Sequence, residues 1–157
     1  MARMVIKGLD EYALKLSKLG AASDKIAKKV VMAGASPVAD EIRKNLIANL
    51  RDPEYAGKGS PEGFGRAKQT ISTGDLIESF GIAPPAVDKN GNTNTKIGFS
   101  GYDRKGVPNA LKARAMESGT SKLKKRPFVR PAVIKTKKKA IEAMGDELDN
   151  QIKIYAL

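Results

Sequence analysis

The chain offers few side chains that could do chemistry. It contains no histidine and no cysteine, which removes the usual partner of a serine nucleophile, the commonest transition-metal ligand and every thiolate site. The stretch GKGS at Gly57 to Ser60 lacks the upstream glycine of a phosphate-binding loop. Lysine, aspartate and serine could still react, but no converging set of acids accompanies them. We therefore expect no enzyme, no metal and no cofactor.

The positive charge of the chain is concentrated in one segment. The net charge is +12, and residues 104 to 139 contain thirteen Lys or Arg against one acid, Glu117. Such a segment attracts nucleic acid, an acidic protein surface or an anionic membrane, or it is simply a solvated face, and composition does not choose among these. The lysines expected to contact DNA or an acidic partner are Lys122, Lys124, Lys125, Lys135, Lys137, Lys138 and Lys139.

The N-terminal part of the chain is predicted to be mainly helical. After a short strand at Met4 to Lys7, apolar residues at helical spacing predict a helix that ends at Gly20. A longer helix begins near Ser23 or Asp24 and keeps its apolar register across Pro37, which favours one bent helix over two. Its apolar face is expected to lie in the core and comprises Ala27, Val31, Ala35, Val38, Ile42, Leu46 and Leu50.

The segment from Arg51 to Ser72 is predicted to be a long loop. It contains glycines, two prolines and charges without any apolar period. Loops of about 20 residues are uncommon in compact domains, and they are usually either functional or without fixed structure. The sequence does not choose between these two alternatives.

The following segment combines short helices with a hairpin. Ser72 or Thr73 can cap a short helix through Leu76. Asn90-Gly91 is a strong hairpin signal that joins a strand at Phe80 to Ile82 to a returning strand at Thr93 to Phe99. These two runs are expected to pair antiparallel.

Two further helices complete the predicted fold. One follows Pro108 and ends at Gly119. The other has Pro131 in its first turn and is amphipathic, with apolar residues at Ile134, Ile141, Met144, Leu148, Ile152 and Tyr155. We therefore predict an α+β fold, in which long amphipathic helices, including the C-terminal one, cover one face of a small antiparallel sheet. A single domain is expected to span residues 1–157.

Three short motifs occur in a suggestive order. They are TGDL at Thr73 to Leu76, ESGTS at Glu117 to Ser121, and RPFVRPA at Arg126 to Ala132 before the last helix. Together with the strand-Gly-Leu-Asp pattern at Val5 to Asp10, they resemble the tail-completion, or head–tail joining, family of long-tailed bacteriophages. That family shows a T-G-x-L element, an E-x-G-T-S turn and a P-F-x-R-P-A entry into the last helix. The matching positions are Thr73, Gly74, Leu76, Glu117, Gly119, Thr120, Ser121, Arg126, Pro127, Phe128, Arg130 and Pro131.

The resemblance spans nearly the whole chain, and the block from Glu117 to Ala132 is its most specific part. The chain departs from the family pattern in two places. Ser118 stands where family members often place an aromatic residue, and the loop from Arg51 to Ser72 is longer than the common form. A longer loop is expected to serve a partner particular to one phage.

The resemblance implies a structural virion protein that completes the tail of a bacteriophage and joins it to the head at the neck. It also implies a homo-oligomeric ring, sixfold in a long-tailed phage, with other neck and tail proteins as partners. DNA would pass through the channel of the ring, and no membrane would be involved. Assembly would take place in the host cytoplasm. The neighbouring neck roles, tail terminator and stopper, make similar demands on a small protein.

The block from Glu117 to Ala132 can also be interpreted from its residues alone, without the family resemblance. Gly119 permits a positive φ, the two prolines stiffen the path, and Phe128 can anchor it in the core. We favour such a structural turn over a ligand site. Glu117 is expected to pair with Arg126 or Arg130, the alternative being a basic residue on a neighbouring subunit.

The runner-up function is a basic nucleic-acid-binding protein that works alone. Its basis is the positive segment, but Phe128 is the single aromatic residue there that could stack on a base. No helix-turn-helix or zinc pattern accompanies the charge.

Overall fold

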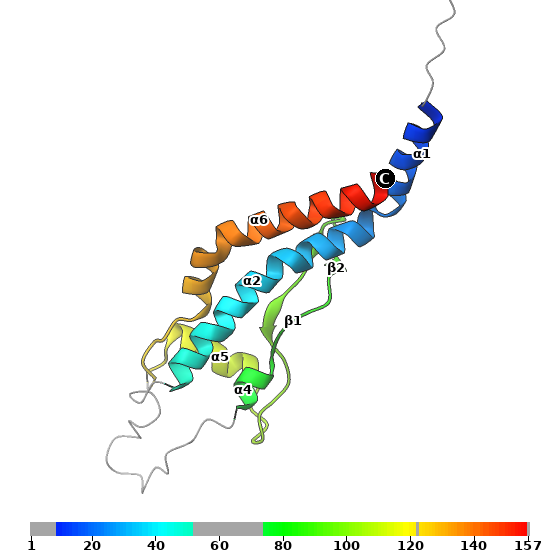
Figure 1. Ribbon diagram of the computed structural model, residues 1–157. Helices are drawn as coiled ribbons and strands as arrows, with labels where there is room; N and C mark the ends of the chain where they lie inside the picture. The colour runs from blue at the N-terminus through cyan, green and yellow to red at the C-terminus, as the bar shows by residue number, and fades with distance from the viewer. Residues whose placement is uncertain (1–8, 52–73, 122, 157) are drawn as a thin grey trace, which may run out of the picture.

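The computed structural model of the chain describes residues 9–51, 74–121 and 123–156. The predicted strand at 4–7, Thr73, Lys122 and the loop segment 52–72 lie outside these residues. Figure 1 shows two long helices side by side, two short helices near one end of them, and a hairpin that extends along one of the long helices. The elements are α1 (Leu9–Ala21), α2 (Ser23–Arg51), α4 (Asp75–Glu78), β1 (Phe80–Ile82), β2 (Ala86–Val87), β3 (Thr93–Asn94), β4 (Ile97–Phe99), α5 (Asn109–Ser118) and α6 (Val129–Ala156).

The predicted α+β class is confirmed, with small antiparallel sheets against long helices. β1 pairs antiparallel with β4, and β2 pairs antiparallel with β3. The hairpin turn forms where Asn90-Gly91 predicted it, because Gly91 adopts a φ of 80° and Asp88 accepts the backbone N–H groups of Asn90 and Asn92, both at 2.8 Å. The strands form two separate two-stranded sheets rather than one.

α2 runs as one continuous helix through Pro37, as predicted. Proline lacks a backbone N–H, so one intrahelical hydrogen bond is lost there. Ser36 does not restart the helix, since its hydroxyl donates to the carbonyl oxygen of Met32 at 3.2 Å. The face predicted to lie in the core is correct in its centre, where Ala35, Ile42 and Leu46 are buried.

α2 and α6 pack antiparallel through small residues. A Cβ atom on Gly34 would lie 2.5 Å from Cγ of Met144 and 3.3 Å from the carbonyl oxygen of Ala140. The buried residues of α6 include Ala132 and Thr136, and the Thr136 hydroxyl donates to the carbonyl oxygen of Ala132 at 2.7 Å. Small side chains and a glycine let the two helix axes approach closely.

The core lies where the hairpin, α4 and α5 meet the long helices. Leu46 and Phe128 are completely buried, and Leu76 and Met116 belong to the same cluster. The ring of Phe99 lies 5.1 Å from that of Phe80 and 6.0 Å, edge-on, from that of Phe128, measured between centroids. Edge-on and tilted contacts of this kind stabilise aromatic clusters beyond their buried area.

The loop before α5 is organised by Asp103. Its carboxylate accepts the backbone N–H groups of Lys105 at 2.8 Å and Val107 at 2.7 Å, and it forms an ion pair with Lys112. The side-chain hydrogen bond from Lys112, followed by the backbone ones, lowers the pKa of Asp103 to about 2. The loop therefore keeps its charged anchor throughout the neutral range.

Several predicted boundaries were wrong. Gly20 lies inside α1, which ends at Ala21, and Arg51 is the last residue of α2 rather than the first of a loop. The N-cap of α4 is Gly74, with φ 80°, in place of the predicted Ser72 or Thr73, which lie outside the described residues. A left-handed glycine places the chain for the helix without supplying an acceptor.

Candidate functional site

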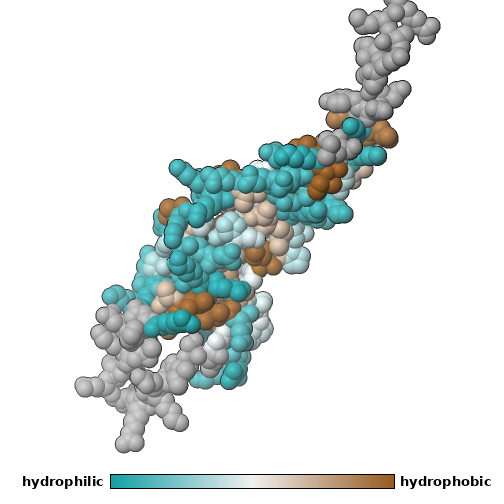
Figure 2. All heavy atoms as spheres, viewed as in Figure 1, coloured by the Kyte–Doolittle hydropathy of each residue, from teal (hydrophilic) through white to brown (hydrophobic). Residues whose placement is uncertain are grey.

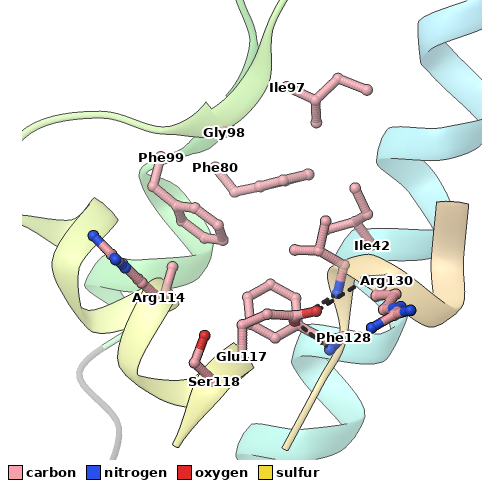
Figure 3. A pocket seen from close by; sticks show the side chains of 12 residues that line it. Ile42, Phe80, Ile97, Gly98, Phe99, Arg114, Glu117, Ser118, Phe128 and Arg130 are labelled. Carbon is pink, nitrogen blue, oxygen red and sulfur yellow. Dashed lines mark hydrogen bonds between the residues drawn. The ribbon is translucent and has the colours of Figure 1, made fainter.

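The block that resembles the phage family folds around the carboxylate of Glu117. Its Oε2 accepts the backbone N–H groups of Phe128 at 2.7 Å and Val129 at 2.9 Å, and its Oε1 accepts that of Arg130 at 3.0 Å. Figure 3 shows the side chain reaching from α5 to the start of α6. The first amides of a helix have no intrahelical acceptor. Glu117, a residue of the preceding helix, therefore caps α6.

The capping contact also sets the ionisation of Glu117. Partial burial opposes the charged form, but the three backbone N–H groups outweigh it and hold the pKa of Glu117 below its usual range. The positive end of the α6 dipole acts in the same direction. Glu117 is thus a charged group in the neutral range.

Glu117 was expected to pair with Arg126 or Arg130. The structure instead gives its carboxylate backbone partners, among them the N–H of Arg130 rather than its guanidinium group. Those partners carry no sequence signal, because every residue except proline has a backbone N–H. The predicted structural role of the block agrees with this geometry.

The turn between α5 and α6 requires Gly119. It adopts φ 76° and ψ 171°, a region that is essentially restricted to glycine. A Cβ atom there would lie 3.0 Å from the backbone nitrogen of Lys125 and 3.1 Å from the carbonyl oxygen of Leu123. Thr120 closes the turn, since its hydroxyl oxygen accepts the N–H of Leu123 at 3.0 Å.

Replacing Gly119 with alanine is expected to lower the free energy of unfolding by roughly 1–3 kcal/mol from the backbone conformation alone. The close backbone contacts add to this loss. Gly106 is a matched control because it also has a φ of 76° but open space around it. Urea denaturation should therefore show a larger loss for Gly119→Ala than for Gly106→Ala. Equal losses would mean that the close contacts contribute nothing.

α2 holds the same turn from the other side. The side-chain amide of Asn45 donates to the carbonyl oxygen of Phe128 at 3.2 Å, and that of Asn49 donates to the carbonyl oxygen of Arg126 at 3.3 Å. The N–H of Arg126 donates to the carbonyl oxygen of Met116 at 2.9 Å. Sequence reasoning missed both asparagines, and their i, i+4 spacing on one helix face was the only available signal.

The remaining motif residues divide between core and surface. Leu76 and Phe128 meet in one buried cluster, which joins the T-G-x-L element to the later block. Ser121, Pro127, Arg130 and Pro131 are exposed. Thr73 lies outside the described residues.

Two hollows flank the Glu117 contact. One has a volume of about 320 Å³ and is lined mainly by core side chains such as Phe80, Phe99 and Phe128. The other, of about 620 Å³, is an open depression whose lining combines Pro127 and Ile134 with the basic residues Lys125, Arg130 and Lys135. Because backbone donors hold the Glu117 carboxylate, neither hollow has a free carboxylate of Glu117 for acid–base chemistry.

The predicted contact lysines are exposed wherever the structure describes them. They are Lys124, Lys125, Lys135, Lys137, Lys138 and Lys139, and Lys122 lies outside the described residues. Lys135 is partly engaged, because its ammonium group lies 2.7 Å from the carboxylate of Glu41 on α2. Surface lysines of this kind attract anions without ordering them.

Comparison of the chain with protein-family models, with curated proteins and with solved structures finds no match. Within the described ranges, no group of three or more acidic side chains could hold a metal ion. In the same part of the chain, no helix has both the length and the apolar character needed to cross a membrane.

Proposed function

We propose that this protein is a structural subunit of a tailed-bacteriophage particle, which completes the tail and joins it to the head at the neck. The family resemblance of the block from Glu117 to Ala132 supplies this identity. The role is to present surfaces to other subunits, and no bond is made or broken. A tail terminator or stopper would use the same kind of surfaces.

The observation that carries an assembly role is the outward position of large apolar side chains on α6. Ile134 is 71% exposed and Ile141 is 61% exposed, while the face of α6 against α2 carries Ala132, Thr136, Ala140 and Met144. Figure 2 shows hydrophobic residues emerging among hydrophilic ones along α6 and on α1. Isolated exposed apolar residues are ordinary, but a row of them along one helix is typical of an interaction surface.

The geometry of the Glu117 block supports the same proposal. Its residues fix where α6 begins and how it lies on α2 and α5. Residues that fix the start of a helix in this way hold it in one orientation, as a helix that contacts a partner requires. The open depression beside Lys125 and Arg130 offers a basic, partly apolar binding surface to an acidic partner ring.

A stand-alone nucleic-acid-binding function is the second candidate. The exposed Lys137, Lys138 and Lys139 favour it. Phe128, the aromatic residue that could have stacked on a base, is 0% exposed, and the exposed Tyr102 lies just outside the basic segment. Charge without a stacking residue supports phosphate contact more than recognition of a single strand.

Light scattering of the purified chain, with and without duplex DNA and at low and high salt, tests the proposal. The expected result is an oligomer larger than a dimer, or a monomer, whose mass DNA does not change at physiological salt. A salt-sensitive DNA complex of a monomer or dimer would overturn the proposal in favour of the second candidate. The triple variant Lys137→Gln, Lys138→Gln, Lys139→Gln is the control, because it should weaken only a complex that depends on those charges.

A further inference from the structure

The C-terminal half of α6 carries an exposed apolar row that flanks its contact with α2. We name it the outer stripe; it consists of Ile141, Gly145, Leu148 and Ile152. Spacings of four, three and four residues place these positions on one side of a helix. Ile141 is 61% exposed and Leu148 is 41% exposed. A Cβ atom on Gly145 would meet nothing within 4 Å, so no close contact within the chain explains a glycine there.

α1 is an amphipathic helix whose apolar face is poorly covered by the described part of the chain. It has 13 residues, and although it contacts α2 and α6, Leu16 remains 52% exposed. Ala13 and Leu16 are exposed on the same face, and Leu19 is only half-buried. Isolated helices of this length are marginal in water. α1 therefore gains stability from any surface that covers this apolar face.

The outer stripe and α1 match in length, and the C-terminal half of α1 complements the stripe in charge. A helix of 13 residues is about 20 Å long, and the stripe from Ile141 to Ile152 extends over about 17 Å. The C-terminal half of α1 carries the exposed Lys15 and Lys18, whereas its first turn contains Asp10 and Glu11. The exposed acids in the same half of α6 are Glu142, Asp146 and Asp149. Opposite charges beside two apolar faces favour their association, and an open glycine permits close approach of a second helix.

The positions of the two surfaces fit contact between side-by-side copies. Figure 1 shows α1 and the C-terminal end of α6 at the same end of the elongated molecule. Rotation about an axis parallel to the long direction keeps this end of each copy at the same height. The α1 of one copy then lies close to the height of the C-terminal end of α6 of the next, where the outer stripe ends. Contact between two different surfaces generates a closed ring when the rotation closes.

We propose that α1 of one copy binds the outer stripe of a neighbouring copy and so links the subunits head to tail. The inference rests on the proposed assembly role and names the surfaces that carry it. The partner that binds α1 is then a second copy of this chain.

Two single variants and their mixture test the contact. Leu16→Glu removes the apolar face of α1, and Ile141→Glu disrupts the outer stripe; both sites are more than half exposed, so both chains should fold. Each variant alone is expected to be monomeric by light scattering. An equimolar mixture is expected to form a 1:1 heterodimer, because the α1 of the Ile141→Glu chain can still bind the stripe of the Leu16→Glu chain. Leu111→Glu, at a 57% exposed site on α5, is the matched control and should keep the wild-type mass.

The other outcomes overturn the contact in distinguishable ways. If Leu16→Glu keeps the wild-type mass while Ile141→Glu is monomeric, the stripe pairs with itself or with another surface. If the mixture stays monomeric up to about 1 mM, where even weak specific contacts form, α1 does not bind the stripe. A wild-type chain that is monomeric up to that concentration and indifferent to DNA also overturns the contact, but it leaves the proposed neck role standing. A salt-sensitive DNA complex overturns the neck role, and the heterodimer test then still decides the contact.

Discussion

Replacing Glu117 with alanine is expected to lower the free energy of unfolding by about 3 kcal/mol. The carboxylate accepts three backbone N–H groups at the start of α6, and hydrogen bonds to a charged group contribute about 1.5–3 kcal/mol each, less where water can replace the acceptor. Glu117 is only partly buried, so the sum is discounted. Urea denaturation with a far-UV signal measures the loss. A loss below about 0.5 kcal/mol, typical of an ordinary surface site, would contradict the capping role.

Glu117→Gln separates charge from hydrogen bonding in the same contact. The amide keeps one acceptor oxygen but no charge, so this variant should recover part of the stability. Because the folded-state pKa of Glu117 is lowered below 4.5, its charge stabilises the fold above that pH, and the contribution is lost as the pH falls through the folded pKa. The difference between wild type and Glu117→Gln should be constant from pH 6 to 8 and shrink below about pH 4.5. A difference that does not change with pH would exclude the charge as its source.

Replacing Phe128 with alanine is expected to cost about 3–5 kcal/mol, the usual loss for a large buried aromatic residue. Phe128 is 0% exposed and packs edge-on against Phe99. Phe128→Leu should recover much of the loss while still lacking the aromatic contact, which contributes about 0.5–1.5 kcal/mol. Tyr102→Ala, at a 71% exposed site, is the matched control and should change the stability by less than about 0.5 kcal/mol. Thermal unfolding by calorimetry compares the three variants, and similar values for Phe128→Ala and Tyr102→Ala would contradict the assigned core.

The sequence predicted the elements better than the packing. Helical periodicity located α2 and α6, and Asn90-Gly91 located the hairpin, because these signals are local. Of the apolar residues that defined α6 as amphipathic, Met144 lies against α2, but Ile134 and Ile141 face outward. Large apolar residues do not identify the contact face of a helix where two helices approach through glycine, alanine and threonine, because these small residues give a weak periodic signal.

The candidate site was predictable in outline only. Glu117 was recognisable as the single acid of a basic segment, and Gly119 as the terminator of α5. The backbone amides that bind the carboxylate could not be recognised from the sequence, since almost every residue type supplies the same N–H donor. The asparagine contacts from α2 were equally hidden, because Asn45 and its acceptor on Phe128 are 83 positions apart in sequence. Contacts of that separation depend on how the two long helices are aligned.

Three side-chain contacts fix the alignment of α2 with α6. Lys135 meets Glu41 at 2.7 Å near one end, Met144 lies over Gly34 in the middle, and Lys29 donates to the side chain of Gln151 at 3.0 Å near the other end. Between these contacts the two helices meet mainly through small residues such as Thr136 and Ala140, which allow close approach but interlock less deeply than large side chains. These three contacts therefore determine how far along α2 the end of α6 reaches and, in the proposed ring, the height at which each copy would present its C-terminal helix.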